Sequence, residues 1–144
     1  MGALIKSCVS LWLCLAAATV QADLVVVSSP KSGIERLSRQ EVVYLFMGRL
    51  RQLPNGQPAV PLDLDETMPE RADFYRQLVN KEPADIKAYW SRLVFSGASR
   101  PPLVAESREA LIRQIHGTPG ALGYIERSKV DSRLRVLFDF SQPN

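Results

Sequence analysis

Cysteine and histidine, the side chains that most often carry thiol and metal chemistry, are nearly absent from this chain. The two cysteines, Cys8 and Cys14, both lie near the start of its 144 residues, and Cys14 is a poor lipid-anchor site because it follows the bulky Trp12-Leu13. The single histidine, His116, ends a predicted helix, where an imidazole usually serves the last carbonyls. Beyond the first residues, disulfides, thiol catalysis and the usual zinc sites are therefore excluded, and no set of acid, base and nucleophile suggests an enzyme.

A long apolar run is also missing. The apolar stretch Val9–Ala18 is too short to span a bilayer. It follows a positive residue, Lys6, and precedes Val20-Gln21-Ala22, which fits a small-x-Ala cleavage site. Residues 1–22 are therefore predicted to be a cleaved signal peptide, and residues 23–144 to be one periplasmic domain without a membrane span.

Neither sign of charge dominates the composition. The chain has 18 Lys and Arg against 15 Asp and Glu, and its formal net charge is +3. This is far below the positive charge of a typical nucleic-acid-binding domain, so nucleic acid is not an expected partner. A hydrophobic content of 46% is ordinary for a globular domain with one core.

Helix and strand signals alternate along the predicted domain. Leu24–Ser28 is a buried strand by its β-branched run, and Pro61 marks an edge strand or a strand terminus. Capping boxes begin helices at Ser38 and Thr67. The further predicted elements are an extended segment at 59–64, helices from Pro83 and after Ser107, a short strand ending at Ile125, and a strand at 134–140. This order indicates an α/β domain with about four helices covering a small sheet.

The segment Gly117–Ile125 joins the last predicted helix to a strand. Gly117 is expected to stop the helix in a left-handed conformation, and Pro119 prevents the helix from resuming. Gly120 and Gly123 are expected to let two stretches of backbone pass close together. A tight helix-to-strand joint is therefore predicted here.

Three carboxylates, Asp63, Asp65 and Glu66, stand close together between a strand and a helix. They could form half of an acid/base pair or a weak calcium site, although the glycine and distal Glu of a calcium loop are missing. A solvated loop that leads into a capped helix explains them better.

Anion binding is the better candidate chemistry. The helix after Thr67 offers free backbone N–H groups, and Arg71 lies in its first turn. The loop after the third helix adds the hydroxyls of Ser96 and Ser99 and the guanidinium of Arg100. Helix capping and solvated surface charge explain the same residues, and Glu70 beside Arg71 argues against a dry anion pocket.

Several short segments follow one another along the chain: Leu37-Ser38-x-x-Glu41 followed by Leu45–Arg49, Pro54-Asn55-Gly56 through Leu62, Arg71–Phe74, Tyr89-Trp90, Phe95-Ser96-Gly97 and Thr118–Tyr124. In this order they resemble the periplasmic phosphate-binding proteins, the soluble receptors of phosphate ABC importers. The resemblance implies one lobe of a type 2 periplasmic binding protein, without a cofactor or a metal. It also implies a substrate-binding role with phosphate or another small oxyanion, with Thr67, Arg71, Ser96, Ser99 and Arg100 as tentative contacts.

The chain departs from that family in two ways. The receptors are about twice as long and bind ligand between two lobes. They also carry small hydroxyl and glycine residues before the helix that contains Phe74, where this chain has acidic or bulky residues from Asp63 to Glu70. Weak oxyanion binding is therefore expected, unless a homodimer rebuilds the cleft. The alternative is an interaction module that has lost its ligand and contacts an envelope protein such as a sensor or a transporter subunit.

Overall fold

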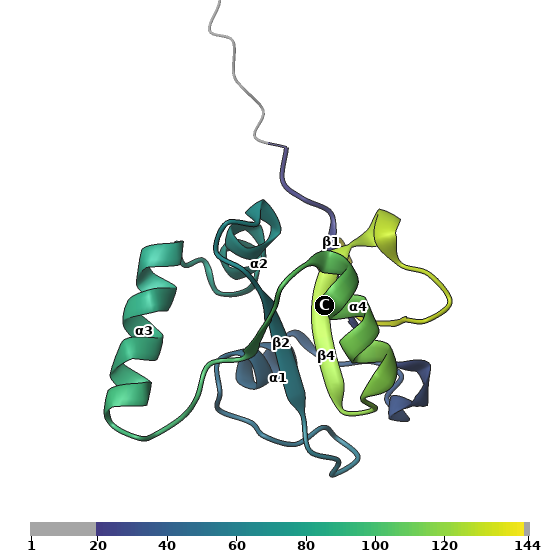
Figure 1. Cartoon of the computed structure of the whole chain (residues 1–144), viewed down its shortest axis with the longest axis horizontal. Coiled ribbons are helices and arrows are strands. Elements are labelled where there is room, and N and C mark those ends of the chain that lie inside the picture. Colours follow the sequence, from purple (N-terminus) through teal and green to yellow (C-terminus); the bar gives the residue numbers. More distant parts are fainter. Residues whose placement is uncertain (1–19, 143–144) are drawn as a thin grey trace, which may run out of the picture.

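The computed structural model describes residues 20–142, so nearly all of the predicted signal peptide lies outside the described part. The strands are β1 (Leu24–Ser28), β2 (Val60–Leu64), β3 (Leu103–Ala105), β4 (Ala121–Glu126) and β5 (Arg135–Asp139). The helices are α1 (Arg39–Phe46), α2 (Pro69–Val79), α3 (Pro83–Phe95) and α4 (Arg108–Gly117). The strands form one mixed sheet in the order β3-β2-β4-β1-β5, with helices around it (Figure 1). The predicted α/β class is confirmed, and no helix within residues 20–142 is long and apolar enough to cross a membrane.

Two crossovers set the layers of the fold. The chain leaves β2, forms α2 and α3, and returns to the sheet as the edge strand β3, parallel to β2. It then forms α4 and crosses back over β2 to β4, which is also parallel to β2. Because both connections keep the right-handed sense, the first runs over one face of the sheet and the second over the other. Figure 1 shows this arrangement, with α4 in front of β4 and with α1 and α2 behind the sheet.

Strand β1 lies inside the sheet and is buried along its whole length. It pairs antiparallel with β4 on one side and with β5 on the other. A strand covered on both faces favours a continuous apolar run over alternation, which explains its sequence Leu-Val-Val-Val-Ser.

Local start signals explain three of the helices. Ser38 caps α1 in a complete capping box, in which Ser38 Oγ accepts from the Glu41 N–H at 3.2 Å and Glu41 accepts from the Ser38 N–H at 2.7 Å. Pro83 is the first residue of α3, and Ser107 caps α4 by accepting from the Ala110 N–H at 3.0 Å. These three predictions are confirmed.

The capping box predicted at Thr67 is wrong. The residue before α2 is Met68, which makes no side-chain cap, and Pro69 opens the helix. The Thr67 hydroxyl donates instead to Asp65 Oδ1 at 2.7 Å, in a turn that precedes the helix. Glu70 does not reach back to a cap because its carboxylate is buried against Arg108.

Strand β3 was not predicted from the sequence. Its three residues are too few for a periodic pattern, and Pro101-Pro102 before them suggested only a loop. The segment becomes a strand because it pairs with β2, where Leu62, Asp63 and Leu64 lie opposite its three residues. Pro61 precedes this pairing, so the predicted strand terminus, rather than an edge strand, is what the structure shows.

The joint after α4 is tight, as predicted, but its glycines do not all play the predicted roles. Gly117 is the last residue of α4 and has no positive φ, and Thr118 caps the helix. Gly120 packs against the Pro58 carbonyl so closely that a Cβ there would overlap the oxygen. Gly123 faces the side chains of Leu111 and Ile115 rather than other backbone. The predicted close approach of backbone to backbone is thus confirmed at Gly120 alone.

Aromatic side chains join the helices to the sheet. Phe74 of α2 stacks on Tyr124 of β4, with ring centroids 3.8 Å apart and planes 5° apart. Phe46 of α1 meets Phe74 edge-on at 4.8 Å. Each such pair adds about 0.5–1.5 kcal/mol beyond the area that it buries. Packing of this kind holds together a domain whose cysteines lie outside the described residues.

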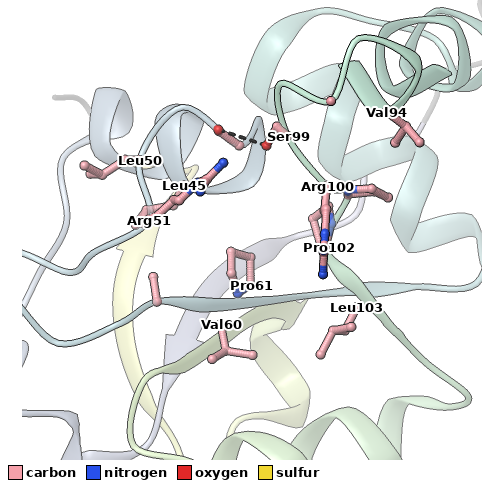
Figure 2. Close-up of a pocket in the computed structure, with 14 residues that line it drawn as sticks. Leu45, Leu50, Arg51, Val60, Pro61, Val94, Ser99, Arg100, Pro102 and Leu103 are labelled. Atoms are coloured by element: carbon pink, nitrogen blue, oxygen red, sulfur yellow. Dashed lines mark hydrogen bonds between the residues drawn. The ribbon is translucent and has the colours of Figure 1, made fainter. Parts of the chain in front are cut away.

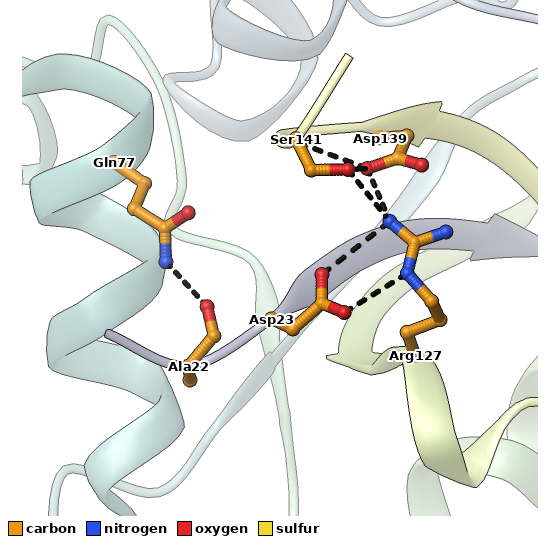
Figure 3. Close-up of polar contacts among 6 residues, drawn as sticks. All are labelled: Ala22, Asp23, Gln77, Arg127, Asp139 and Ser141. Atoms are coloured by element: carbon orange, nitrogen blue, oxygen red, sulfur yellow. Dashed lines mark hydrogen bonds and ion pairs between the residues drawn. The ribbon is translucent and has the colours of Figure 1, made fainter. Parts of the chain in front are cut away.

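One arginine fastens both ends of the described chain to the sheet. Arg127, directly after β4, donates from Nε to Asp23 Oδ2 at 3.0 Å and from its backbone N–H to the Asp23 carbonyl at 2.8 Å. The same guanidinium pairs with Asp139 of β5 and donates to Ser141 Oγ at 3.1 Å (Figure 3). The bond from Arg127 is the main reason why the pKa of Asp139 falls to about 2.

Candidate functional site

The sheet has two candidate functional sites. One lies at the carboxyl ends of the parallel strands and the other at their amino ends. At the carboxyl edge, the register pairs Leu64 of β2 with Ala105 of β3. The next helix after each strand, α2 and α4, therefore begins at the same edge. In open α/β sheets this edge is the usual place for ligands, and helix N-termini favour anions.

Asp63 of β2 is the centre of a buried polar network at this edge. Its Oδ1 accepts from the Leu64 N–H at 2.8 Å and from the Tyr124 hydroxyl. Its Oδ2 accepts from the Tyr75 hydroxyl at 2.7 Å and from Arg71 Nε at 3.3 Å. Burial, and then the charge of Asp63, raises the pKa of both phenols well above the usual value. Both tyrosines are therefore hydrogen-bond donors at neutral pH.

The solvated loop predicted for the three carboxylates is wrong for Asp63, which is 3% exposed. Strand β2 is covered on both faces here, so Leu62, Asp63 and Leu64 are all buried. Asp65 belongs to the turn with Thr67, and Glu66 is exposed. No group of three or more potential metal ligands occurs within residues 20–142.

Arg71, the predicted anion contact, is already paired. Its side chain is 15% exposed, bonds to Asp63 through Nε, and places its guanidinium carbon 5.2 Å from the centroid of the Tyr75 ring. Burial acts to lower the pKa of Arg71, but the charge of Asp63, the two tyrosines and the hydrogen bond to Asp63 together outweigh burial and raise the pKa above its usual value. Beyond this pair lies a hollow of about 490 Å³, whose lining includes Lys87, Trp90, Phe95 and Glu66.

A second carboxylate, Glu70, joins the starts of α2 and α4. It is 5% exposed and accepts from Arg108, the first residue of α4. Burial acts to raise the pKa of Glu70, but its own backbone N–H and Arg108 lower the pKa below the usual range. A buried carboxylate of the chain thus lies in the first turn of α2.

The amino edge of the parallel strands carries a different site. A hollow of about 720 Å³ lies between the end of α1, the start of β2 and the loop from α3 to β3 (Figure 2). Its polar lining is Arg51, Ser99 and Arg100, and none of the described residues that line it is Asp or Glu. Ser99 Oγ donates to the Gly48 carbonyl at 3.1 Å, which fastens the loop to the end of α1.

The structure separates the tentative anion contacts into two groups. Ser99 and Arg100 line the hollow at the amino edge, whereas Thr67 and Arg71 lie beyond the carboxyl end of β2. The strand between these edges is about 13 Å long. Ser96 belongs to neither group, because its hydroxyl donates back to the Leu93 carbonyl of its own helix at 3.1 Å.

Sequence reasoning did not identify Arg51, Arg108 or the role of Asp63. One sequence signal was available for Arg51: neither Val42–Leu62 nor Ile86–Ala105 contains an Asp or a Glu, although together they hold five cationic residues. These two segments meet at the amino edge. Arg108 carried no signal, because its partner Glu70 is 38 residues away in the chain.

No protein-family model and no curated protein sequence matches this chain. Solved structures do resemble it. An ABC-type phosphate transport receptor from Vibrio cholerae has a TM-score of 0.64 and 14% identity, over 81% of this chain and 45% of the receptor. The chain has the fold of one lobe of a type 2 periplasmic binding protein.

Two other phosphate-related proteins give the same result. A putative phosphate ABC transporter substrate-binding protein from Clostridium perfringens, solved with bound phosphate, has a TM-score of 0.61 and 13% identity, over 81% of this chain and 44% of that protein. PstS from Borrelia burgdorferi has a TM-score of 0.61 and 14% identity, over 81% of this chain and 47% of that protein. The chain therefore spans less than half the length of these proteins, and the identities support the shared fold alone.

Proposed function

We propose that this chain is an exported, non-catalytic interaction module that uses the lobe fold of a solute receptor to bind a protein. The main support for this proposal is that side chains of the protein itself pair with the charged groups at the carboxyl edge. Asp63 takes up the charge of Arg71, and Glu70 occupies the start of α2. An incoming phosphate would meet two buried carboxylates there and no unpaired buried cation among the described residues.

Exposed apolar side chains favour a protein partner over a small ion. Val94 and Phe95 at the end of α3 are 54% and 96% exposed, and Leu103 and Val104 of β3 are 63% and 58% exposed. An apolar group of this kind with a polar rim is typical of an interaction surface. An envelope protein, such as a sensor or a transporter subunit, is the proposed class of partner.

Weak oxyanion binding is the second candidate, and the hollow with Arg51, Ser99 and Arg100 favours it because no carboxylate lines its described part. Each ion pair that remains in water contributes only about 0–1 kcal/mol. Two such pairs fall short of the 4 kcal/mol or so that a millimolar dissociation constant needs. Tight phosphate binding would require a second lobe or a second copy.

Export remains part of the proposal. Asp23, which would follow the cleavage site, is the first described residue held by its side chain, through Arg127 (Figure 3). The Ala22 carbonyl before it only accepts one bond, from the Gln77 side chain at 2.9 Å. Cleavage after Ala22 would thus leave the Asp23 anchor intact. Sequencing the N-terminus of the protein isolated from the periplasm tests this point, with Asp23 as the expected first residue.

Calorimetric titration tests the choice between the two candidates. The processed protein, residues 23–144, is unfolded and refolded to remove bound solute, then titrated with phosphate and sulfate at low salt. No heat at millimolar concentrations is expected. Micromolar binding of phosphate would overturn the proposal and establish a receptor.

A further inference from the structure

Four exposed apolar side chains lie at the end of α3 and on β3, here called the α3–β3 face: Val94, Phe95, Leu103 and Val104. These residues account for most of the large apolar side chains that are exposed in the described chain, where only Val20 and Val136 stand elsewhere. Val94 also lines both neighbouring hollows, the one beside Arg71 and the one with Arg51 and Arg100. The α3–β3 face therefore runs directly into the concave part of the surface.

Strand β3 gives this face an open sheet edge. It pairs with β2 on one side and is the last strand of the described sheet on the other. Its sequence Leu-Val-Ala carries no charge. The edge strand at the opposite end, β5, begins with Arg135 and ends with Asp139. Charged side chains discourage the addition of a strand, so β3 is the more receptive edge.

Cations outnumber carboxylates around the two hollows beside this face, although an exposed carboxylate, Glu106, directly follows β3. Arg51 and Arg100 line the larger hollow and Lys87 lines the smaller one, and none of the three takes part in an ion pair within residues 20–142. Glu66 is the one carboxylate that lines either adjoining hollow in the described structure. A partner with acidic side chains therefore fits, and a second copy of the same face does not, because it would bring cations together.

We propose that the α3–β3 face binds an extended, acidic segment of a partner protein, which adds to the sheet as a strand beside β3. Backbone groups of the segment pair with the open edge, as in other complexes formed by strand addition. Apolar side chains of the segment cover Phe95 and Val104, and its carboxylates face Arg51 and Arg100. This inference rests on the proposed function and specifies the site and the chemistry of the partner.

A membrane with anionic lipids would also match the positive charge. It would leave the backbone groups of β3 and the concave hollow without a counterpart, because lipid head groups do not form a strand. The extended protein segment is therefore the better match, and the membrane is treated as an outcome of the test.

The test uses a fluorescein-labelled probe peptide, Asp-Val-Glu-Phe-Asp-Val-Glu, and a control in which Lys replaces each acidic residue. Fluorescence anisotropy with the processed protein should show binding of the acidic probe and at least tenfold weaker binding of the basic control. Phe95→Ala should weaken binding of the acidic probe about tenfold. Arg100→Glu should reverse the preference between the two peptides. Arg135→Glu, on the opposite edge, is the matched control and should change nothing.

Hydrogen exchange locates the bound probe. The amides of Leu103–Ala105 should gain protection when the acidic peptide is added, whereas those of β5 should not. Equal binding of both peptides, no effect of Phe95→Ala, or protection elsewhere would overturn the inference. Binding to vesicles of phosphatidylcholine and phosphatidylglycerol, without binding to the probe, would overturn it in favour of a membrane. The phosphate titration is an independent test. If phosphate produces no heat and the acidic probe does not bind either, this inference is wrong but the proposed function still stands.

Discussion

The two edges of the parallel strands use charge in opposite ways. At the carboxyl edge, each buried carboxylate has a cation beside it, Asp63 with Arg71 and Glu70 with Arg108. At the amino edge, Arg51 and Arg100 border a hollow without a carboxylate among its described lining. A buried carboxylate that is already paired with a cation cannot lose that partner without a large cost, whereas unpaired exposed charges remain available to a binding partner. The charges at the carboxyl edge are thus paired within the domain, whereas the proposed function uses the unpaired charges at the amino edge.

The largest effect should follow removal of the carboxylate in the carboxyl-edge network. Asp63→Ala leaves Arg71 and two tyrosine hydroxyls without their buried acceptor, and should lower the free energy of unfolding by about 3–5 kcal/mol. Urea unfolding measures the change. Asp65→Ala, in the adjacent exposed turn, should cost about 1 kcal/mol or less. Equal losses in the two variants would contradict a structural role confined to Asp63.

Glu70→Ala should lower the free energy of unfolding by about 1–3 kcal/mol, because the partly exposed Arg108 loses its partner. It also tests whether this carboxylate stands in for an anion. Phosphate added to the variant should raise its thermal midpoint, and should leave that of the parent protein unchanged. A variant that does not respond to phosphate would show that Glu70 serves only as a partner of Arg108.

The joint after α4 offers a matched pair of glycine variants. Gly120→Ala places a Cβ against the Pro58 carbonyl and should cost about 1–3 kcal/mol. Gly117→Ala meets no atom within 4 Å and ends a helix, so it should be neutral or stabilising by up to about 1 kcal/mol. Thermal unfolding of both proteins compares them directly. If Gly117→Ala is destabilised, the result would favour the left-handed conformation that the sequence predicts for Gly117.

The ion pair of Arg127 with Asp139 should appear as an acid dependence of stability. The folded protein lowers the pKa of Asp139 from 3.8 to about 2, so between these values the unfolded state binds more protons. Stability from this pair is therefore complete above pH 4 or so and is lost as the pH falls toward 2. Asp139→Asn should cost about 1 kcal/mol at pH 6 and much less at pH 2. A loss of the same size at both pH values would exclude this linkage.

The smallest effect on folding is expected at the α3–β3 face. Phe95 is 96% exposed, so Phe95→Ser should change the free energy of unfolding by less than about 0.5 kcal/mol. The same change should raise the solubility of the protein, because it removes an exposed aromatic ring. A stability loss above 1 kcal/mol or so would mean that Phe95 packs within the domain rather than against a partner.

The sequence alone determined the elements whose signals are local. The buried strand β1, the caps of α1 and α4, and Pro83 at the start of α3 can each be read within a few residues, because burial patterns and caps depend on near neighbours. Tertiary structure alone decided the site. Tyr124 meets Asp63 across 61 positions of sequence, and Arg108 meets Glu70 across 38. Pairing with β2 likewise created β3, whose three residues carry no periodicity. Such contacts depend on how distant segments pack, so the sequence could place the charged residues but could not show which of them neutralise one another.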